Sequence, residues 1–207
     1  MMVKVKICGI TNATDALMAA SAGADALGFN FWPHSPRYVP PEQALPIRLS
    51  LPPFVAAVGL FVDAPVERIR EVADYCGLDY VQLHGRETPR KLAQLGDLRI
   101  IKAIRISGEE DLKQLDRYRA EGFLLDTYVK GQPGGTGQTF DWSLARQASH
   151  RARIILAGGL TPENVADAVR AARPYGVDVA SGVEEAPGKK SRRLVTDFIR
   201  AAKSVDL

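Results

Sequence analysis

Two patterns of hydrophobic residues alternate along this chain. Short runs of β-branched and other apolar residues recur 20 to 30 residues apart, and they begin near Val3, Asp25, Val55, Asp79, Arg99, Phe123, Arg153 and Val177. Between these runs, apolar residues repeat at helical spacing, as they do at Val165, Ala168, Val169 and Ala172. The alternation predicts eight strand–helix units in series.

Helix start signals support this interpretation. Thr88-Pro89 and Thr161-Pro162 each resemble an N-cap residue followed by proline in the first helical position. Ser107 and Glu110 have the spacing of a capping box, in which each side chain bonds to the other residue's backbone. We therefore expect helices to begin at these three places.

Strand–helix repeats with nearly continuous apolar strands favour a parallel sheet covered by helices. Eight repeats can close into an α/β (β/α)8 TIM barrel, and 207 residues lie at the lower edge of the size range of that fold. An open doubly wound sheet is the rival, but no G-x-G-x-x-G follows the first strand. The prediction is a single barrel domain spanning residues 1–207.

Composition argues against a nucleic-acid-binding, membrane-spanning, disulfide-rich or metal-binding protein. The formal net charge is only +3 and the basic residues are dispersed, which does not indicate a nucleic-acid partner. The first residues contain no apolar signal core, and the longest apolar stretch, residues 54–62, is too short to cross a membrane. Cys8 and Cys76 are too few for a disulfide framework, and no metal-site spacing is present. We expect a cytoplasmic protein with reduced thiols and no metal.

The active site of a barrel is built where the carboxyl ends of its strands meet. Two of the predicted connections at that end are long, residues 30–41 and 127–141. Polar or small residues also end the strands, and they read Cys8, Asn30, Asp63, His84, Arg105, Asp126, Gly158-Gly159 and Ser181-Gly182. We expect the chemistry to lie among these residues.

The last two strand ends suit a phosphate group. Gly158 and Gly159 follow the seventh strand, while Ser181 and Gly182 follow the eighth. Barrels commonly bind phosphate at these two positions, through loop amides and the N-terminus of a short extra helix. Each motif alone is more often a simple turn, but together they predict a phosphate-binding site.

Cys8 and Asp126 are the candidate acid/base pair. Alternation places Cys8 on the same side of the first strand as Lys4 and Lys6, which predicts that the thiol faces the barrel interior near cationic groups that favour a thiolate. Asp126 ends an apolar strand and would deliver one carboxylate to the same opening. The simpler interpretations are a small buried cysteine and a capping carboxylate.

Three further residues are candidates with weaker signals. Asp178 would pair with Lys6 across the first and eighth strands. Arg37 lies in a proline-stiffened loop that could hold its guanidinium toward a carboxylate, although a solvated arginine is a serious competitor. His84 shares its side of the fourth strand with Gln82, and such a histidine is as often structural as catalytic.

The remaining features have simple explanations. Residues 131–139 have the glycine content of a mobile lid but could be merely flexible. Residues 189–193 (KKSRR) are most simply a solvated basic run that enters the last helix. Cys76, before Gly77 at the end of the third helix, is expected to be structural.

The strand-end motifs together resemble one family, phosphoribosylanthranilate isomerase. They are residues 6–11 (KICGIT), 28–31 (GFNF), 35–39 (SPRYV), 81–85 (VQLHG), 124–126 (LLD), 134–137 (GGTG), 140–142 (FDW), 156–160 (LAGGL) and 181–184 (SGVE). The match runs in order over nearly the whole chain. One departure is Lys190-Ser191, where the family often has Lys-Asp; serine also caps helices, so only details of that loop are affected.

The resemblance implies a cofactor-independent Amadori rearrangement in tryptophan biosynthesis. N-(5-phosphoribosyl)anthranilate would become 1-(o-carboxyphenylamino)-1-deoxyribulose 5-phosphate, with Asp126 as general acid and Cys8 as general base. Arg37 would contact the anthranilate end of the substrate, and His84 and Asp178 would lie nearby. Gly158, Gly159, Ser181 and Gly182 would hold the phosphate. The resemblance leaves open whether the protein is a monomer or a homodimer.

Two alternatives remain at this stage. Another barrel enzyme of sugar phosphates would need metal-binding histidines, of which only His34, His84 and His150 are available, or a lysine acid, for which Lys102 is the one candidate. A barrel that only binds a phosphorylated metabolite would bind a product analogue without turnover.

Overall fold

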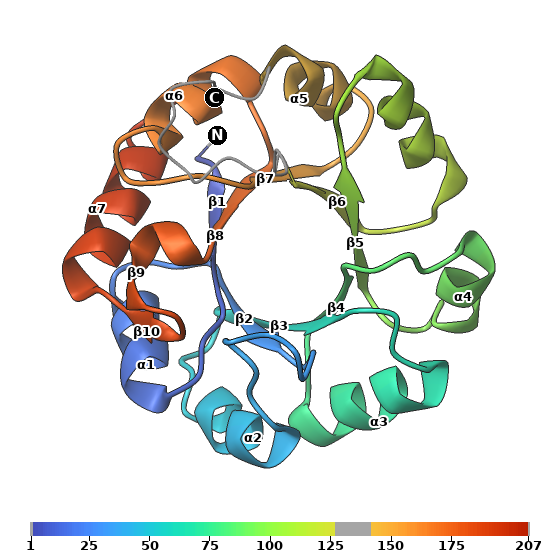
Figure 1. The fold of residues 1–207 in the computed structure, drawn as a ribbon. Coiled ribbons are helices and arrows are strands. Elements are labelled where there is room, and N and C mark those ends of the chain that lie inside the picture. The colour runs from blue at the N-terminus through green and yellow to red at the C-terminus, as the bar shows by residue number, and fades with distance from the viewer. Residues whose placement is uncertain (1, 127–141, 207) are drawn as a thin grey trace.

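A closed barrel of eight parallel strands forms the centre of the protein. The structure, a computed structural model, describes residues 2–126 and 142–206. Each strand pairs with its sequence neighbours, and β8 closes the ring on β1 (Figure 1). The strands are β1 (Lys4–Cys8), β2 (Ala26–Asn30), β3 (Ala56–Phe61), β4 (Tyr80–Leu83), β5 (Ile100–Arg105), β6 (Gly122–Asp126), β7 (Ile154–Ala157) and β8 (Gly176–Val179). The predicted barrel is confirmed, and every predicted strand start lies within one residue of the observed start.

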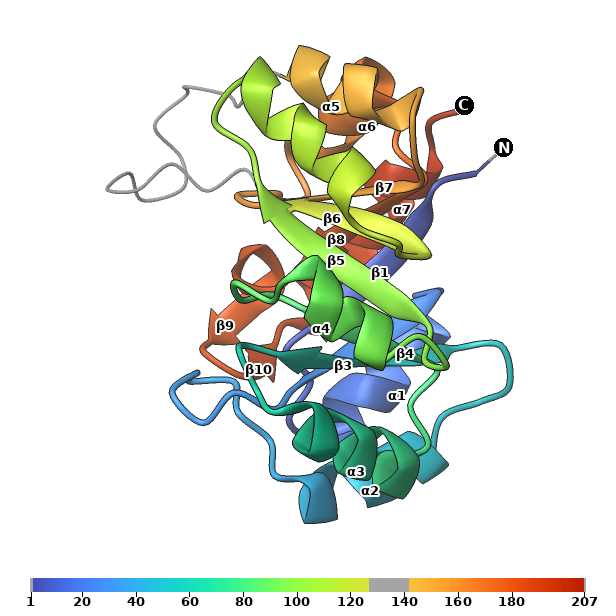
Figure 2. The same ribbon diagram turned by 90° about the vertical axis from the view of Figure 1, so that its right-hand side faces the viewer.

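Helices surround the barrel, as Figures 1 and 2 show. They are α1 (Ala13–Ser21), α2 (Pro41–Leu49), α3 (Val66–Cys76), α4 (Pro89–Gln94), α5 (Trp142–Ser149), α6 (Val165–Ala172) and α7 (Arg192–Lys203). The connection between β5 and β6 instead carries a 3-10 helix, η1 (Glu109–Arg117). After β8 come a short 3-10 helix, η2 (Ser181–Val183), and a small hairpin of β9 (Glu184–Ala186) and β10 (Lys189–Lys190).

The predicted helix starts were only partly right. Thr88 caps α4 by accepting a hydrogen bond from the Lys91 amide, as predicted. Helix α6 begins at Val165 rather than Pro162, because a turn comes first in which Asn164 accepts from the Thr161 amide. Before η1, the Ser107 amide and hydroxyl donate to Asp111, not to Glu110, because the helix starts one residue later than predicted, with Gly108 as its N-cap and Asp111 as its third residue.

Two apolar clusters stabilise this arrangement. The larger one lies between the outward sides of the strands and the helices and includes Phe29, Phe61 and Phe198, all fully buried. The smaller one fills the barrel interior and consists of Val58, Ile101, Ala103, Leu124 and Ala157. Side chains alternate between these two environments along every strand, so the residues at the strand ends face either the interior or the helices.

The two ends of the barrel differ. The termini emerge at one end, whereas β9, β10 and the β2–α2 loop lie at the other (Figure 2). A cavity of about 430 Å³ opens at the end where the strands start, lined by Lys4, Tyr80, Arg99 and Phe54 among others. Phe54 is fully exposed there and has a positive φ of 71°. The candidate site residues lie at the opposite end, where the strands finish.

Candidate active site

Cys8 ends β1 on the interior side of the barrel. Its Sγ lies so close to Gly28 on β2 that a Cβ atom placed at Gly28 would be 2.8 Å from the sulfur and 3.0 Å from Nζ of Lys6. Gly28 therefore makes room for the thiol and for the lysine ammonium. Cys8 is only 6% exposed, yet it does not belong to the cluster beneath the helices. The predicted orientation of the thiol is confirmed.

Lys6 and Asp178 form a buried ion pair below the thiol. Nζ of Lys6 lies 2.8 Å from Oδ1 of Asp178, and the strand register places the two residues side by side on β1 and β8. Burial disfavours the charged lysine, but attraction to Asp178 and to Cys8 outweighs it and raises the pKa of Lys6. The predicted pairing is confirmed, and it places a permanent positive charge beside the thiol.

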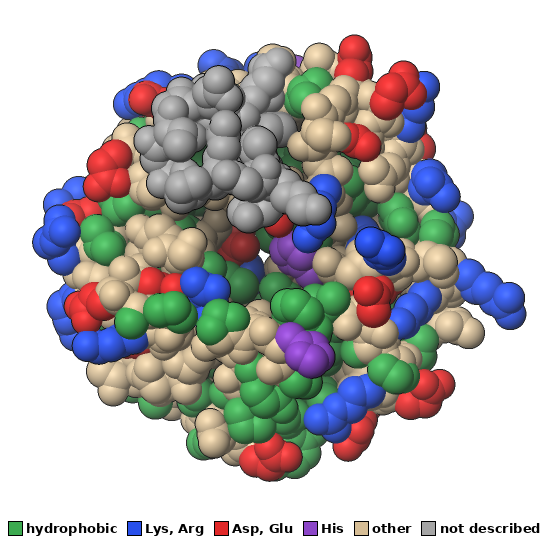
Figure 3. All heavy atoms as spheres, viewed as in Figure 1, with side chains coloured by type: hydrophobic (Ala, Val, Ile, Leu, Met, Phe, Trp, Pro, Cys, Tyr) green, Lys and Arg blue, Asp and Glu red, His purple; other side chains and the backbone are tan. Residues whose placement is uncertain are grey.

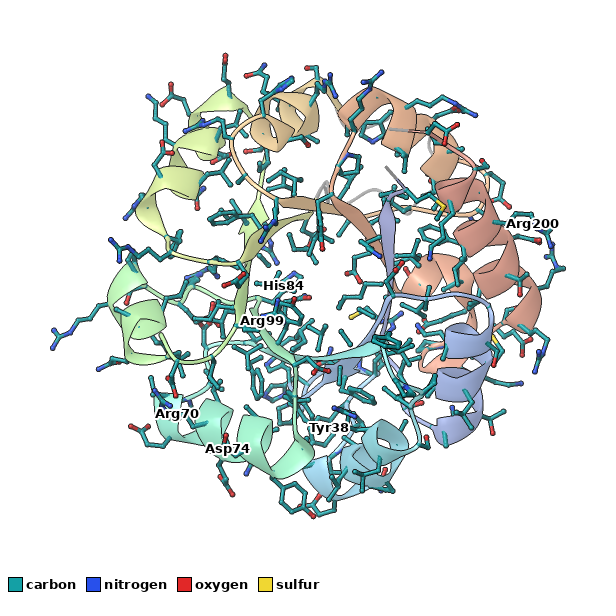
Figure 4. The ribbon with its side chains drawn as sticks, turned by 180° about the vertical axis from the view of Figure 1, so that it is seen from behind. Tyr38, Arg70, Asp74, His84, Arg99 and Arg200 are labelled. Carbon is teal, nitrogen blue, oxygen red and sulfur yellow. The ribbon has the colours of Figure 1, made fainter. Side chains whose placement is uncertain are left out.

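Asp126 ends β6 and contacts His84, which follows β4. His84 Nε2 lies 3.4 Å from Oδ2 of Asp126, and His84 Nδ1 lies 3.0 Å from Nε2 of Gln82. Gln82 is fully buried in the barrel interior. Figure 4 shows His84 directed toward the middle of the barrel. The sequence did not settle whether His84 is structural, and the structure places its ring between a buried amide and the candidate acid.

Arg37 is held by Glu184, the first residue of β9. Nε of Arg37 lies 2.9 Å from Oε1 of Glu184, and Nη2 lies 2.6 Å from Oε2. The aliphatic stem of Arg37 crosses Gly9, where an added Cβ would lie 2.5 Å from Cδ of the arginine. Arg37 is therefore not a solvated loop residue. Because Glu184 occupies Nε and Nη2, the N–H groups of Nη1 remain directed elsewhere and suit a second carboxylate.

Lys190 contradicts the prediction of a solvated basic run at residues 189–193. Its side chain is fully buried, and Nζ donates to the backbone carbonyls of Cys8 and Ala180 and to Oε1 of Glu184. Ser191 is also buried and stands at the N-cap of α7 without a capping hydrogen bond, unlike the capping serine expected there. The β9–β10 hairpin folds this segment back over the barrel, which charge pattern alone does not reveal.

Glu184 and Lys190 are thus residues whose importance sequence reasoning missed. Burial alone would raise the pKa of Glu184, but hydrogen bonds from Arg37 and Lys190 outweigh it and lower the pKa. Burial also lowers the pKa of Lys190, against the attraction of Glu184. The pair links the end of β1, the end of β8 and the Arg37 loop through hydrogen bonds.

The two predicted phosphate loops lie against each other. Gly158 and Gly159 have positive φ values of 86° and 63°, a backbone conformation that favours glycine. A Cβ added to Gly182 would lie 2.0 Å from the carbonyl oxygen of Leu160, so the two loops touch at a position where only glycine fits. Ser181 and Gly182 belong to the short helix η2, as the barrel rule anticipates.

Lys102 is bound in a structural clamp rather than presented as an acid. Its buried Nζ donates to Glu87 at 2.8 Å and to the carbonyls of Leu83 and Gly85. Glu87 in turn accepts from the amides of Asp63 and Gly85. The lysine that a rival barrel enzyme would need is therefore fully engaged in holding the backbone on both sides of His84.

Figure 3 shows this end of the molecule hollowed at the centre of the barrel, with acidic, basic and histidine side chains beside the hollow. Among the described residues, no group of three or more His, Cys, Asp or Glu is arranged to hold a metal ion. No helix in the described part of the chain is both long and apolar enough to cross a membrane. The predicted lid, residues 131–139, lies outside the described residues.

Comparison with known proteins identifies the family of this barrel. Residues 5–201 match the family model described as N-(5'phosphoribosyl)anthranilate (PRA) isomerase. The chain belongs to the phosphoribosylanthranilate isomerase family. The isomerase of Pelobacter propionicus is 54% identical over 202 residues, which cover 98% of this chain and 96% of that protein. The family assignment makes the chain an isomerase of tryptophan biosynthesis, as the strand-end motifs indicated.

Solved phosphoribosylanthranilate isomerases share the fold. One, in complex with reduced 1-(o-carboxyphenylamino)-1-deoxyribulose 5-phosphate, is 46% identical with a TM-score of 0.89, covering 99% of this chain and all of that one. Another, from Thermotoga maritima, is described as dimeric and was studied as monomers; it is 44% identical with a TM-score of 0.88 and the same coverage. The similarity to these isomerases therefore extends over the whole barrel.

Proposed function

We propose that the residues at the carboxyl ends of the strands catalyse the Amadori rearrangement, with Asp126 as general acid and Cys8 as general base. The observation that supports this most is their common placement. Asp126 is the last residue of β6 and Cys8 is the last residue of β1, and both side chains lie at the same end of the barrel interior. Each has a polar partner that could serve its role, His84 for Asp126 and Lys6 for Cys8. One acid and one base on a small sugar are what the reaction requires.

The reaction then proceeds in two proton transfers. Asp126 gives its proton to the ring oxygen of the ribose as the bond between that oxygen and C1 breaks, which produces an open-chain Schiff base. The Cys8 thiolate removes the proton from C2, and the C2 electron pair moves toward the protonated imine nitrogen to give an enolamine. Tautomerisation of the enolamine forms the ketone. No electrons leave the substrate, so the chemistry itself requires neither a redox cofactor nor a metal.

Two anchors would hold the ends of the substrate. The Nη1 edge of Arg37, which Glu184 does not occupy, suits the anthranilate carboxylate, while Glu184 keeps the guanidinium plane in position. Backbone amides around Gly158, Gly159, Ser181 and Gly182 suit the phosphate. Asp178 acts here through Lys6, its partner in the ion pair. Fixing both ends places C1 and C2 between acid and base, which lowers the entropic cost of the reaction.

We further propose that residues 1–207 form one catalytic domain and that the enzyme works in the cytoplasm without nucleic-acid partners. Of the two oligomeric states left open by the sequence, the homodimer has support from Phe54. Phe54 is fully exposed at the rim of a cavity of about 430 Å³, at the end of the barrel opposite the candidate site, so the ring of one copy could pack into the cavity of another. The dimeric relative from Thermotoga maritima is consistent with this.

A turnover assay tests the proposed function. The purified protein is incubated with N-(5-phosphoribosyl)anthranilate, and the loss of substrate fluorescence is followed with and without a metal chelator. We expect many turnovers per protein molecule and no effect of the chelator. Tight binding of the reduced product analogue without any turnover would instead identify a barrel that only binds a phosphorylated metabolite.

A further inference from the structure

Gln82 is a fully buried amide that the reaction scheme does not use. It lies in the barrel interior on β4, with Nε2 directed at Nδ1 of His84 at 3.0 Å. Its other polar atom, Oε1, has no hydrogen-bond partner among residues 2–126 and 142–206. A buried polar atom without a partner is destabilising, so the placement of this amide beside His84 carries a cost.

The orientation of the amide decides where His84 carries its proton. An amide nitrogen is only a donor, so Nδ1 of His84 must accept and cannot carry a hydrogen. The hydrogen of the neutral imidazole is then on Nε2, which faces Oδ2 of Asp126 at 3.4 Å. With the amide reversed, Oε1 would accept from Nδ1–H. Nε2 could then take the proton of Asp126, which would leave both ring nitrogens protonated.

This choice matters because His84 and Asp126 can compete for one proton. A histidine beside a carboxylate readily becomes an imidazolium, and an Asp126 that faces an imidazolium is held in its ionised form. An ionised carboxylate has no proton to give to the ring oxygen. A donor at Nδ1 opposes protonation of that nitrogen, which leaves the proton available to Asp126. After the transfer, Nε2–H can stabilise the new carboxylate.

The backbone around His84 is fixed independently of the amide. Lys102 binds the carbonyls of Leu83 and Gly85, the residues on either side of His84, and Glu87 binds the Gly85 amide. The charged groups of this clamp contact backbone atoms of the strand end, whereas the ring nitrogens contact Gln82 and Asp126. Changing the amide should therefore alter the protons on the ring and leave the position of the strand end intact.

We propose that Gln82 is a positioning residue that keeps His84 neutral, with its hydrogen on Nε2, so that Asp126 retains the proton it delivers to the substrate. This rests on the proposed role of Asp126 as the acid. A purely structural role for Gln82 predicts that its replacements lower stability and leave the protons on His84 unchanged, since a buried carboxylate is costly in any case. The proposal predicts that glutamate also changes the protons on the ring, because a carboxylate at this position accepts from Nδ1–H and favours the imidazolium.

Nitrogen NMR of the wild-type enzyme tests the proton position directly. The chain has only three histidines, His34, His84 and His150, so a 15N-histidine-labelled sample gives a simple spectrum that His84→Gln assigns. At neutral pH we expect a protonated Nε2 and an unprotonated Nδ1 for His84. A hydrogen on Nδ1 would overturn the proposal, and this measurement requires no variant of Gln82 to fold.

Kinetics of Gln82→Glu and Gln82→Met provide the second test. We expect kcat to fall in both, with Glu worse than Met and approaching the roughly 10²- to 10⁴-fold that a general acid contributes, while KM changes little. His84 should be doubly protonated in Gln82→Glu. Val81→Ala, on the opposite side of the same strand, is the control for loss of packing, and it should not change the ring protons.

Asp126→Asn, measured alongside, separates the two hypotheses. If Asp126→Asn loses turnover while Gln82→Glu keeps both its kcat and a neutral His84, the Gln82 proposal alone is overturned. If Asp126→Asn turns over normally, the assignment of the acid fails, and the role of Gln82 fails with it.

Discussion

At the scale of single residues, the guanidinium of Arg37 shows how a predicted side chain depends on a partner that was not predicted. The proline-stiffened loop indicated an arginine directed at a carboxylate, but not that Glu184 would hold one edge of it. The two residues are 147 positions apart in the chain. Such contacts depend on how the hairpin after β8 returns over the barrel, which local sequence patterns do not specify.

Replacing Arg37 by lysine should weaken substrate binding despite the conserved charge. The ammonium of lysine lacks the two N–H edges of a guanidinium, so it cannot hold Glu184 on one edge and a second carboxylate on the other. We therefore expect KM to rise by roughly tenfold to a hundredfold with a smaller change in kcat. Steady-state kinetics with N-(5-phosphoribosyl)anthranilate measures both constants. Arg200→Lys on the exposed side of α7 is the control, and an unchanged KM in Arg37→Lys would remove Arg37 from the site.

Glu87 should govern part of the stability in acid. Burial, the largest single influence, would raise its pKa, but the hydrogen bond and charge of Lys102 and the backbone amides together outweigh burial and lower the pKa below its usual value of 4.5. A carboxyl with a depressed pKa in the folded state stabilises above pH 4.5, and this contribution is lost as pH falls through the folded pKa. Glu87→Gln removes this titration and leaves Lys102 without its anion.

Chemical denaturation at a series of pH values checks this prediction. At pH 7, Glu87→Gln should be less stable than the wild type by about 3–5 kcal/mol, as for other broken buried ion pairs. Below pH 4.5 the difference should narrow, because the wild type then loses the same interaction. A constant difference between pH 7 and pH 3 would show that the Glu87 charge does not carry the effect.

At the scale of elements, the strands were predicted well because each is a short and nearly continuous apolar run, buried on both sides. The connections were predicted less well: η1 is a 3-10 helix, α6 starts late, and the hairpin of β9 and β10 was not foreseen. Lys190 was therefore placed in solvent although it is buried between β1, β8 and Glu184. Short polar segments that pack by tertiary contact lack the periodicity that reveals a strand or helix.

The contact between the loops after β7 and β8 should be essential to phosphate binding. In Gly182→Ala the added Cβ would meet the Leu160 carbonyl, so the loops must separate and the amides no longer converge. We expect KM to rise by at least roughly tenfold and the stabilisation by added inorganic phosphate in a thermal melt to disappear. Gly108→Ala is the matched control, because nothing lies within 4 Å of its Cβ position. Retained phosphate stabilisation in Gly182→Ala would contradict this account of the site.

At the scale of the whole molecule, the barrel separates its two ends. The candidate site occupies the end where the strands finish, and the exposed Phe54 lies beside the cavity where they start. The sequence indicated the first end, because polar residues follow apolar strands there. It did not indicate the exposure of Phe54, because this residue opens the longest apolar stretch and would ordinarily be buried.

If Phe54 lies in a dimer interface, Phe54→Ser should produce monomers without loss of the site. We expect sedimentation velocity to show a homodimer for the wild type and a lower mass for the variant, with kcat and KM nearly unchanged because the site is at the other end. Tyr75→Ser, another exposed aromatic residue, is the control. A wild-type protein that sediments as a monomer at micromolar concentration would exclude this interface.

The most direct test of the account is the turnover of Cys8→Ala and Asp126→Asn in the fluorescence assay with N-(5-phosphoribosyl)anthranilate. Both variants should remain folded and bind the reduced product analogue, while kcat falls by roughly 10²- to 10⁴-fold in each. Near-normal turnover in either folded variant would contradict the assignment of that residue as the acid or the base.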